Sequence, residues 1–127
     1  MSSRILKVDP GVMESIFSFL LLGLEPGSFS EKIISGDYQE AEARAHPALK
    51  GDTNSAGEYT VIRDMIDFTN TFIPHYIIDD YKGWIRKGGF KNAPIEDKIM
   101  IKMSLVKCEL FDHYLEKWGD LVGWDNV

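Results

Sequence analysis

The longest run of regularly spaced apolar residues lies in the last third of the chain, from Ala93 to Trp118. One set recurs at steps of three and four, as on one face of an α-helix: Ile95, Ile99, Met103, Val106, Leu110, Tyr114 and Trp118. A second set lies beside it: Ile101, Leu105, Cys108 and Leu115. A helix that is apolar over so much of its circumference needs neighbours on two sides. The pattern therefore predicts one long helix, about residues 94–118, at the centre of an all-α fold.

Turn and capping residues divide the rest of the chain into shorter helices. Asp9 followed by Pro10 is an N-cap and first-turn pair, which predicts a helix over residues 9–22. Three capping boxes, in which a glutamate follows three residues after a serine or aspartate, start at Ser28, Asp37 and Ser55. The helices that they open are expected to end at Gly36, before Pro47 and before Pro74. A further apolar pattern predicts a helix over residues 75–87, which ends at a glycine pair.

These elements predict a single all-α domain over residues 1–127, with five or six helices around the long C-terminal one. A short frayed N-terminus (1–8) and a C-terminal tail (120–127) are expected to flank it. The long helix should pack against the helices of residues 9–22, 55–73 and 75–87. The predicted core comprises Ile16, Leu20, Ile62, Ile66, Phe72, Ile78, Ile99, Met103, Val106 and Leu110.

The composition excludes several classes of protein. A net charge of −6 argues against general binding to the DNA backbone, which requires a basic surface. The apolar run Ile16–Leu24 is far shorter than the roughly 20 residues of a membrane span, so no membrane partner is expected. No signal peptide is expected either, because Pro10 and Glu14 interrupt the N-terminal segment. The single cysteine, Cys108, is predicted to be a buried core residue, which favours a cytoplasmic setting. No cofactor is predicted.

A basic and aromatic stretch, from Tyr81 to Lys91, is the first candidate binding site. Residues 82–107 carry seven basic residues against two acidic ones, although the chain is acidic as a whole. Basic side chains can hold a phosphate, an aromatic ring can stack on a base, and Gly88-Gly89 can offer N–H groups to an anion. The predicted ligand-binding residues are Lys82, Trp84, Arg86, Lys87, Phe90 and Lys91. In the alternative interpretation, the basic residues complement a helix C-terminus and the aromatic residues belong to the core.

The acidic end of the chain is the second candidate. Residues 109–127 hold five acidic residues against one lysine, together with Trp118 and Trp124. Aromatic residues anchor protein interfaces and charge steers the encounter, so Asp112, Glu116 and Trp124 are predicted to bind a basic partner. The alternative is a solvated helix face whose tryptophans cover the core. Charge of both signs would also suit a homo-oligomer.

Histidine and carboxylate pairs are the third candidate. His75 and Asp79 are four residues apart, and so are Glu109 and His113. Two helices that each offer such a pair could meet around a metal ion and support metal-dependent hydrolysis. The HExxH and Glu-x-x-His motifs are absent, and such pairs arise readily by chance in a chain with 20 acidic residues. No metal site is therefore assigned, and no catalytic residue is predicted.

Three short segments carry a resemblance: Pro26-Gly27-Ser28-Phe29, Ser35-Gly36-Asp37 and Ala45-His46-Pro47. Together they resemble segments of small phage-encoded accessory proteins, over roughly the first two fifths of the chain. The resemblance implies an intracellular protein in the cytoplasm of an infected bacterium. It brings no catalytic or binding residues with it.

Three functional hypotheses follow from the sequence. The first is a non-enzymatic phage accessory protein that binds and modulates or inhibits a host protein, for example in host defence. The second is a binder of a phosphate-bearing ligand or nucleotide through residues 81–91. The third is a metal-dependent hydrolase built on His75, Asp79, Glu109 and His113.

Overall fold

A computed structural model describes residues 8–106 and 108–127 of the chain. Over these residues the fold is all-helical, as predicted, with eight α-helices and three 3-10 helices. The first half of the chain forms α1 (Pro10–Leu22), α2 (Ser28–Ser35), α3 (Tyr38–Arg44), η1 (Pro47–Leu49) and α4 (Thr60–Phe72). The second half forms α5 (His75–Asp79), α6 (Tyr81–Lys87), η2 (Phe90–Asn92), α7 (Ile95–Leu105), α8 (Glu109–Val122) and η3 (Trp124–Asn126). Residues 1–7, where a frayed start was expected, and Lys107 lie outside the described part.

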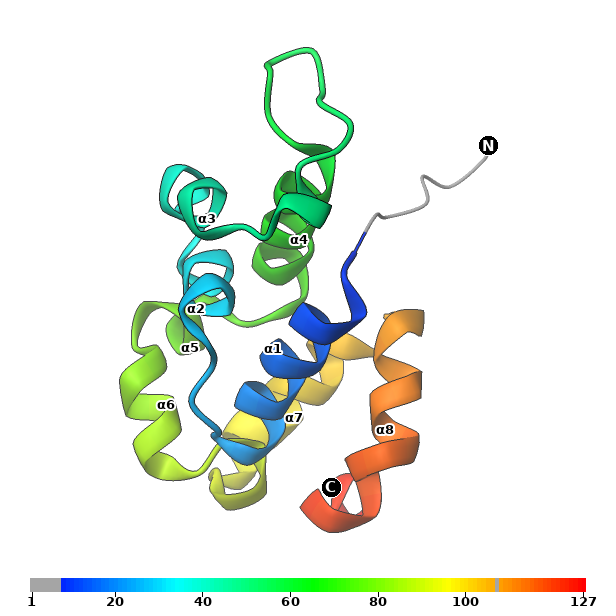
Figure 1. Ribbon diagram of the computed structural model, residues 1–127. Helices are drawn as coiled ribbons and strands as arrows, with labels where there is room; N and C mark the ends of the chain where they lie inside the picture. The colour runs from blue at the N-terminus through cyan, green and yellow to red at the C-terminus, as the bar shows by residue number, and fades with distance from the viewer. Residues whose placement is uncertain (1–7, 107) are drawn as a thin grey trace.

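The helix at the centre of the fold is α1, not the predicted C-terminal helix. Figure 1 shows α1 in the middle of the molecule, with α2, α6 and α8 around it. Six of its thirteen residues are buried: Met13, Ile16, Phe17, Phe19, Leu20 and Leu21. Its ends form as predicted, because the Asp9 carboxylate accepts a hydrogen bond from Val12 N at 3.0 Å and Gly23 adopts a left-handed conformation with φ +69°.

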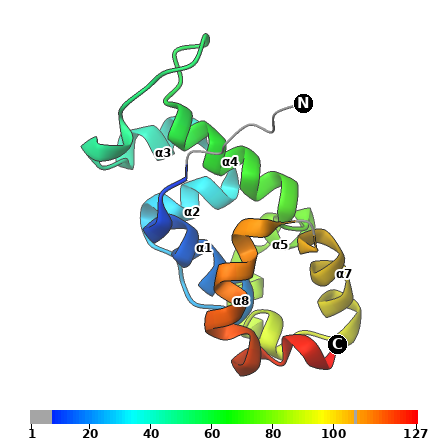
Figure 2. The same ribbon diagram turned by 90° about the vertical axis from the view of Figure 1, so that its right-hand side faces the viewer.

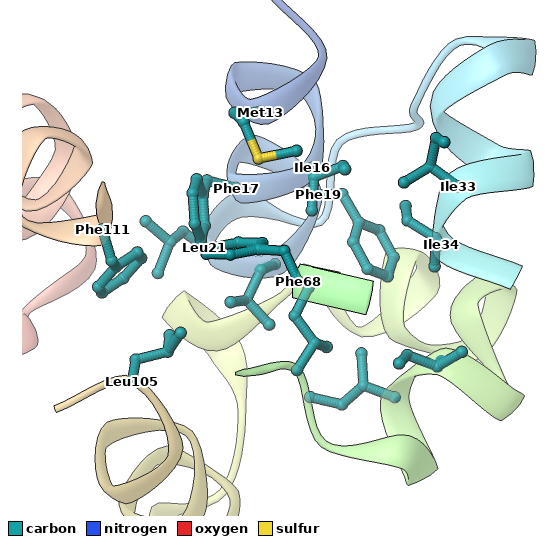
Figure 3. Close-up of a cluster of buried hydrophobic side chains, with 14 of the residues drawn as sticks. Met13, Ile16, Phe17, Phe19, Leu21, Ile33, Ile34, Phe68, Leu105 and Phe111 are labelled. Carbon is teal, nitrogen blue, oxygen red and sulfur yellow. The ribbon is translucent and has the colours of Figure 1, made fainter. Parts of the chain in front are cut away.

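The buried side chains of α1 meet residues from both halves of the chain (Figure 3). The Phe17 ring lies 5.0 Å from the Phe111 ring of α8 and 6.0 Å from the Phe68 ring of α4. Ile33 and Ile34 of α2 approach from the other side and are fully buried. A connected aromatic and aliphatic core therefore holds α1, α2, α4 and α8 together.

The predicted long helix over residues 94–118 is wrong. Instead, α7 ends at Leu105 and α8 begins at Glu109, and Cys108, the N-cap of α8, has an extended conformation with φ −94° and ψ 96°. An unbroken helix of that length would span about 38 Å, which exceeds the diameter of a small domain. The break lets Leu105 and Phe111 enter the same core from two directions.

Two other predicted elements also have different boundaries. The helix expected over residues 75–87 is divided at Asp80, whose carboxylate accepts a hydrogen bond from Gly83 N at 3.2 Å and so caps α6. The expected tail is ordered instead: α8 continues through Gly119 to Val122, and Trp124 in η3 is buried. The left-handed residue that ends α8 is Gly123, with φ +69°.

The capping boxes have three different outcomes. Asp37 caps α3 as predicted, by accepting a hydrogen bond from Glu40 N at 3.2 Å. Ser28 is inside α2, whose N-cap is Gly27, so the helix is present without the box. Ser55 caps nothing, and α4 begins only at Thr60.

The failure of the Ser55 box has a local cause. Glu58, which was expected to reach back to Ser55, instead accepts hydrogen bonds from Arg63 at 3.1 and 2.5 Å and from Asn54 at 3.3 Å. The Arg63 guanidinium lowers the pKa of the Glu58 carboxyl below its ordinary value. Asn54 Oδ1 accepts hydrogen bonds from two backbone N–H groups, those of Ala56 and Glu58, and holds residues 54–58 in a turn.

The predicted core is correct for the first half of the chain and wrong for α7. Ile16, Leu20, Ile62, Ile66 and Ile78 are buried, and Phe72 and Leu110 are partly buried against the core. Ile99, Met103 and Val106 are exposed instead. Helical spacing shows which residues share a face but not which of two apolar faces turns inward, and in α7 the second face, with Ile101 and Leu105, is the buried one.

A pair of alanine substitutions tests which face of α7 is buried. Leu105→Ala should lower the free energy of unfolding by about 2–5 kcal/mol, because the side chain is 2% exposed and its loss leaves a cavity. Met103→Ala, two residues away at 70% exposure, should change it by less than about 0.5 kcal/mol. Urea denaturation of both variants is the measurement, and the reverse order would show that α7 is turned the other way.

Candidate functional site

The outward face of α7 is the largest group of exposed apolar side chains on one described element. Ile95, Ile99 and Met103 lie along this face at helical spacing, Met100 lies beside them, and Val106 at the C-cap continues the face. Val106 is 76% exposed and Met103 is 70% exposed, so most of the surface of these two side chains lies in solvent. Figure 2 shows α7 at the periphery of the molecule. We call these five residues the α7 face.

The opposite side of α7 is fixed to the fold by apolar and polar contacts. Ile101 and Leu105 are buried. The Ser104 hydroxyl donates a hydrogen bond to the Phe72 carbonyl at the end of α4. The Tyr76 hydroxyl of α5 donates to Asp97 Oδ1 at 3.1 Å. The orientation of α7 is therefore specified by one side, while the α7 face is free.

A pocket of about 190 Å³ opens between α7, α8 and η3, at one end of the α7 face. Its apolar lining consists of Leu105, Val106, Phe111, Leu115 and Trp124, and its polar lining consists of Lys102 and Asp112. Pockets for small-molecule ligands usually measure about 300–1,000 Å³. The smaller volume suits a single apolar side chain. We call this site the α7–α8 pocket.

Two of the three predicted partner-binding residues lie in this pocket. Asp112 and Trp124 both line it. Glu116 is exposed one turn further along α8, on the same side of the helix as Asp112. The Trp124 ring, which also lines the pocket, packs against Phe90 and Phe111, with its ring centre 4.9 and 5.1 Å from theirs.

The electrostatic character of this region is acidic. Glu109, Asp112, Glu116 and Asp120 recur at steps of three and four along the exposed side of α8. The lysine of the pocket is engaged within the fold, because Lys102 Nζ donates to the Trp124 and Val127 carbonyl oxygens at 2.8 and 3.1 Å. Lys117 lies toward α1, where it forms an ion pair with Glu14. The four exposed carboxylates of α8 therefore outnumber the two ammonium groups of Lys102 and Lys117.

Two of the predicted ligand-binding residues have a structural role instead. Trp84 is 3% exposed, and its indole N–H donates to the Leu20 carbonyl of α1 at 3.0 Å. Phe90 is fully buried beneath Trp124. Neither ring has a face on which a base could stack, so their assignment as stacking residues is wrong and the core interpretation holds.

The glycine pair does not offer its N–H groups to an anion. Gly88 and Gly89 both have positive φ, as their role in a turn requires, at +87° and +73°. Their N–H groups donate to the carbonyls of Ile85 and Trp84 at 3.0 and 3.2 Å, which completes the C-cap of α6. A Cβ on Gly89 would lie 2.4 Å from Gly23 N. The pair thus permits a close backbone approach between α1 and α6.

The basic residues of the same stretch lie on the surface. Lys82, Arg86, Lys87 and Lys91 are exposed. Lys82 and Arg86 line an open cleft of about 350 Å³ together with Ile85, Tyr81, Glu25 and Glu31. Tyr81 Oη donates to Glu31 Oε1 at 2.5 Å, and this hydrogen bond raises the pKa of the Tyr81 hydroxyl. Two carboxylates in the cleft oppose a phosphate there, so binding of an anion by these four residues stays a prediction.

The residues considered for metal binding do not converge. Within residues 8–106 and 108–127, no group of three or more His, Cys, Asp or Glu side chains could hold a metal ion. His75 is exposed and its Nε2 lies 3.1 Å from the Asn70 carbonyl, while His113 is exposed with its ring edge-on to Tyr114. Asp79 and Glu109 are exposed on their own helices.

Cys108 is buried as predicted, and burial raises the pKa of its thiol.

The contact between Tyr76 and Asp97, which helps to orient α7, can be tested by titration. Partial burial, followed by the nearby Asp97 carboxylate, raises the pKa of the Tyr76 hydroxyl from 10.0 to about 12. Because folding raises this pKa, the stabilisation is complete below pH 10 and is lost as the pH rises toward 12. The ultraviolet difference between wild type and Tyr76→Phe should therefore titrate near pH 12, and near a lower pH in an Asp97→Asn background. A difference signal that titrates at pH 10 would contradict the contact.

Comparison with known proteins gives no relative for this chain: no family model, no curated protein and no solved structure matches it. None of the helices in the described residues has the length and apolar character to cross a membrane.

Proposed function

We propose that the protein is a non-enzymatic interaction module that binds another protein through the α7 face and the α7–α8 pocket. The observation that carries the proposal is the exposure of five apolar side chains within twelve residues, four of them in α7 and the fifth, Val106, at its C-cap. Contiguous apolar patches of this kind mark interaction sites, because exposing them to water has a free-energy cost that a purely structural helix would avoid.

The arrangement also resembles known modes of recognition between proteins. Anchors at positions i, i+4, i+8 and i+11 on one helix face suit packing against another helix or a groove. Two of the five residues, Met100 and Met103, are methionines, which adapt their shape to a partner. The adjoining pocket can receive one anchoring side chain of the partner, and such buried anchors dominate binding energies.

The resemblance of the N-terminal segments to phage-encoded accessory proteins extends this proposal. The partner is then a protein of the bacterial host, which this chain modulates or inhibits. Binding alone can inhibit by covering a surface, so this function requires no catalytic group in the chain.

Affinity capture from bacterial lysate with matched variants tests the proposal. Met103→Glu places a charge at the centre of the α7 face and should weaken the captured complex by about 2 kcal/mol or more, about thirtyfold in affinity. Leu24→Glu is the control, since Leu24 is also exposed, at 53%, but lies after α1. It should bind like wild type. Calorimetry with the purified partner provides the numbers.

Two outcomes would count against the proposal. The first is the absence of a stoichiometric partner at both low and moderate salt. The second is a partner that wild type and Met103→Glu bind with equal affinity, which would place the interface away from α7. Circular dichroism of both variants should match wild type, because the substituted side chains are on the surface.

A further inference from the structure

Resting on the proposed function, we infer that the partner segment is a basic amphipathic helix. Its apolar side lies along the α7 face, one apolar side chain enters the α7–α8 pocket, and its lysine or arginine side chains lie against Asp112 and Glu116 of α8. The inference names the chemistry of the partner, which the proposed function leaves open.

The shape of the surface favours a helix over an extended segment. From Ile95 to Val106 the α7 face runs for about 16 Å, or three helical turns, which is the length over which two packed helices exchange side chains. Pairing by strand addition needs an open strand edge. Residues 8–106 and 108–127 contain one isolated bridge, Thr53 to Tyr59, and it lies in the loop before α4.

The charge around the surface favours a basic segment. Asp112 lines the α7–α8 pocket and is exposed, and Glu116 and Glu109 lie one turn away on either side along α8. Lys102 lines the same pocket, with its ammonium group hydrogen-bonded to the carbonyls of η3 and 5.3 Å from the Trp124 ring centre, so one positive charge there stands against these three carboxylates. Lys98 is similarly placed 5.6 Å from the Phe90 ring centre. A cationic partner would therefore meet an acidic border next to an apolar face.

The same charges disfavour two other occupants. A second copy of the chain, related by a two-fold axis through the pocket, would place the acidic side of α8 opposite itself. A membrane surface is negatively charged at its cytoplasmic leaflet and would repel the same residues. The experiment distinguishes a second copy of the chain and a membrane from the basic helix.

Two synthetic peptides serve as probes. Each is a helix of about 18 residues with leucines at the same helical spacing, and the polar positions carry lysine in one peptide and glutamate in the other. Binding to the full chain is measured by fluorescence anisotropy at about 0.05 and 0.15 M salt. The lysine peptide should bind at least about tenfold more tightly than the glutamate peptide, with a preference that weakens as salt rises.

Three variants separate the apolar contribution from the charge contribution. Met103→Glu should reduce binding of the lysine peptide, because it removes apolar contact even though it adds negative charge. The double variant Asp112→Lys, Glu116→Lys should reverse the preference. The matched control Glu25→Lys, Glu40→Lys changes the net charge equally at exposed positions before α2 and in α3, and should retain the preference of wild type.

Several results would overturn the inference. Equal binding of both peptides to wild type, or no binding of either, would remove the basic helix as partner, while capture that depends on Met103 would leave the proposed function intact. Equal loss of preference in the two charge-reversed variants would show that net charge alone attracts the peptide. Dimerisation of the chain in sedimentation equilibrium, abolished by Met103→Glu, would assign the face to a second copy. Binding to anionic vesicles that Met103→Glu abolishes would assign it to a membrane.

Discussion

The covering of α1 determines the arrangement of the other helices. This helix is apolar on most of its circumference and can be stable in water only if neighbours surround it. The chain supplies them from both sides in sequence: α2 and the Phe68 ring of α4 from the first half, and α6, η2 and α8 from the second. Two specific contacts complete the cover, the hydrogen bond from Trp84 to Leu20 and the backbone contact between Gly23 and Gly89. Both require residues that sequence analysis would otherwise assign to ligand binding.

The same requirement explains why α7 is left partly uncovered. To place Phe111 and Tyr114 against Phe17, the chain must turn after α7 and run α8 along α1. The end of α7 at Leu105 and the new start of α8 at Glu109 provide this, and the side chains that α7 buries in the core are Ile101 and Leu105. The first half of the predicted apolar stripe faces solvent, and the second half, with Tyr114, faces the core. One stripe in the sequence thus supplies one exposed surface and one buried surface.

Sequence patterns predicted those elements whose signals are local. The Asp9-Pro10 start of α1 and the Asp37 cap of α3 depend on side chains within three residues of the helix end. The patterns failed where a tertiary or competing contact decided the outcome. The Glu58 carboxylate forms its hydrogen bonds with Arg63 and not with the Ser55 backbone. Asp80 caps a new helix within a continuous apolar pattern. No proline or glycine in the sequence marks the start of α8 after Cys108.

The candidate site also depends on tertiary contacts that the sequence does not show. Asp112 and Trp124 were identified by the acidic and aromatic character of their segment, and the pocket that unites them depends on η3 folding back over Gly119. The α7 face, by contrast, was present in the sequence as a complete apolar pattern and was assigned to the core, because periodicity carries no information about the inside and the outside. A helix with apolar residues on two faces has more apolar surface than one core contact can cover. That excess is the physical basis of the binding surface that we propose, since a helix with one core contact commonly carries polar residues on its second face.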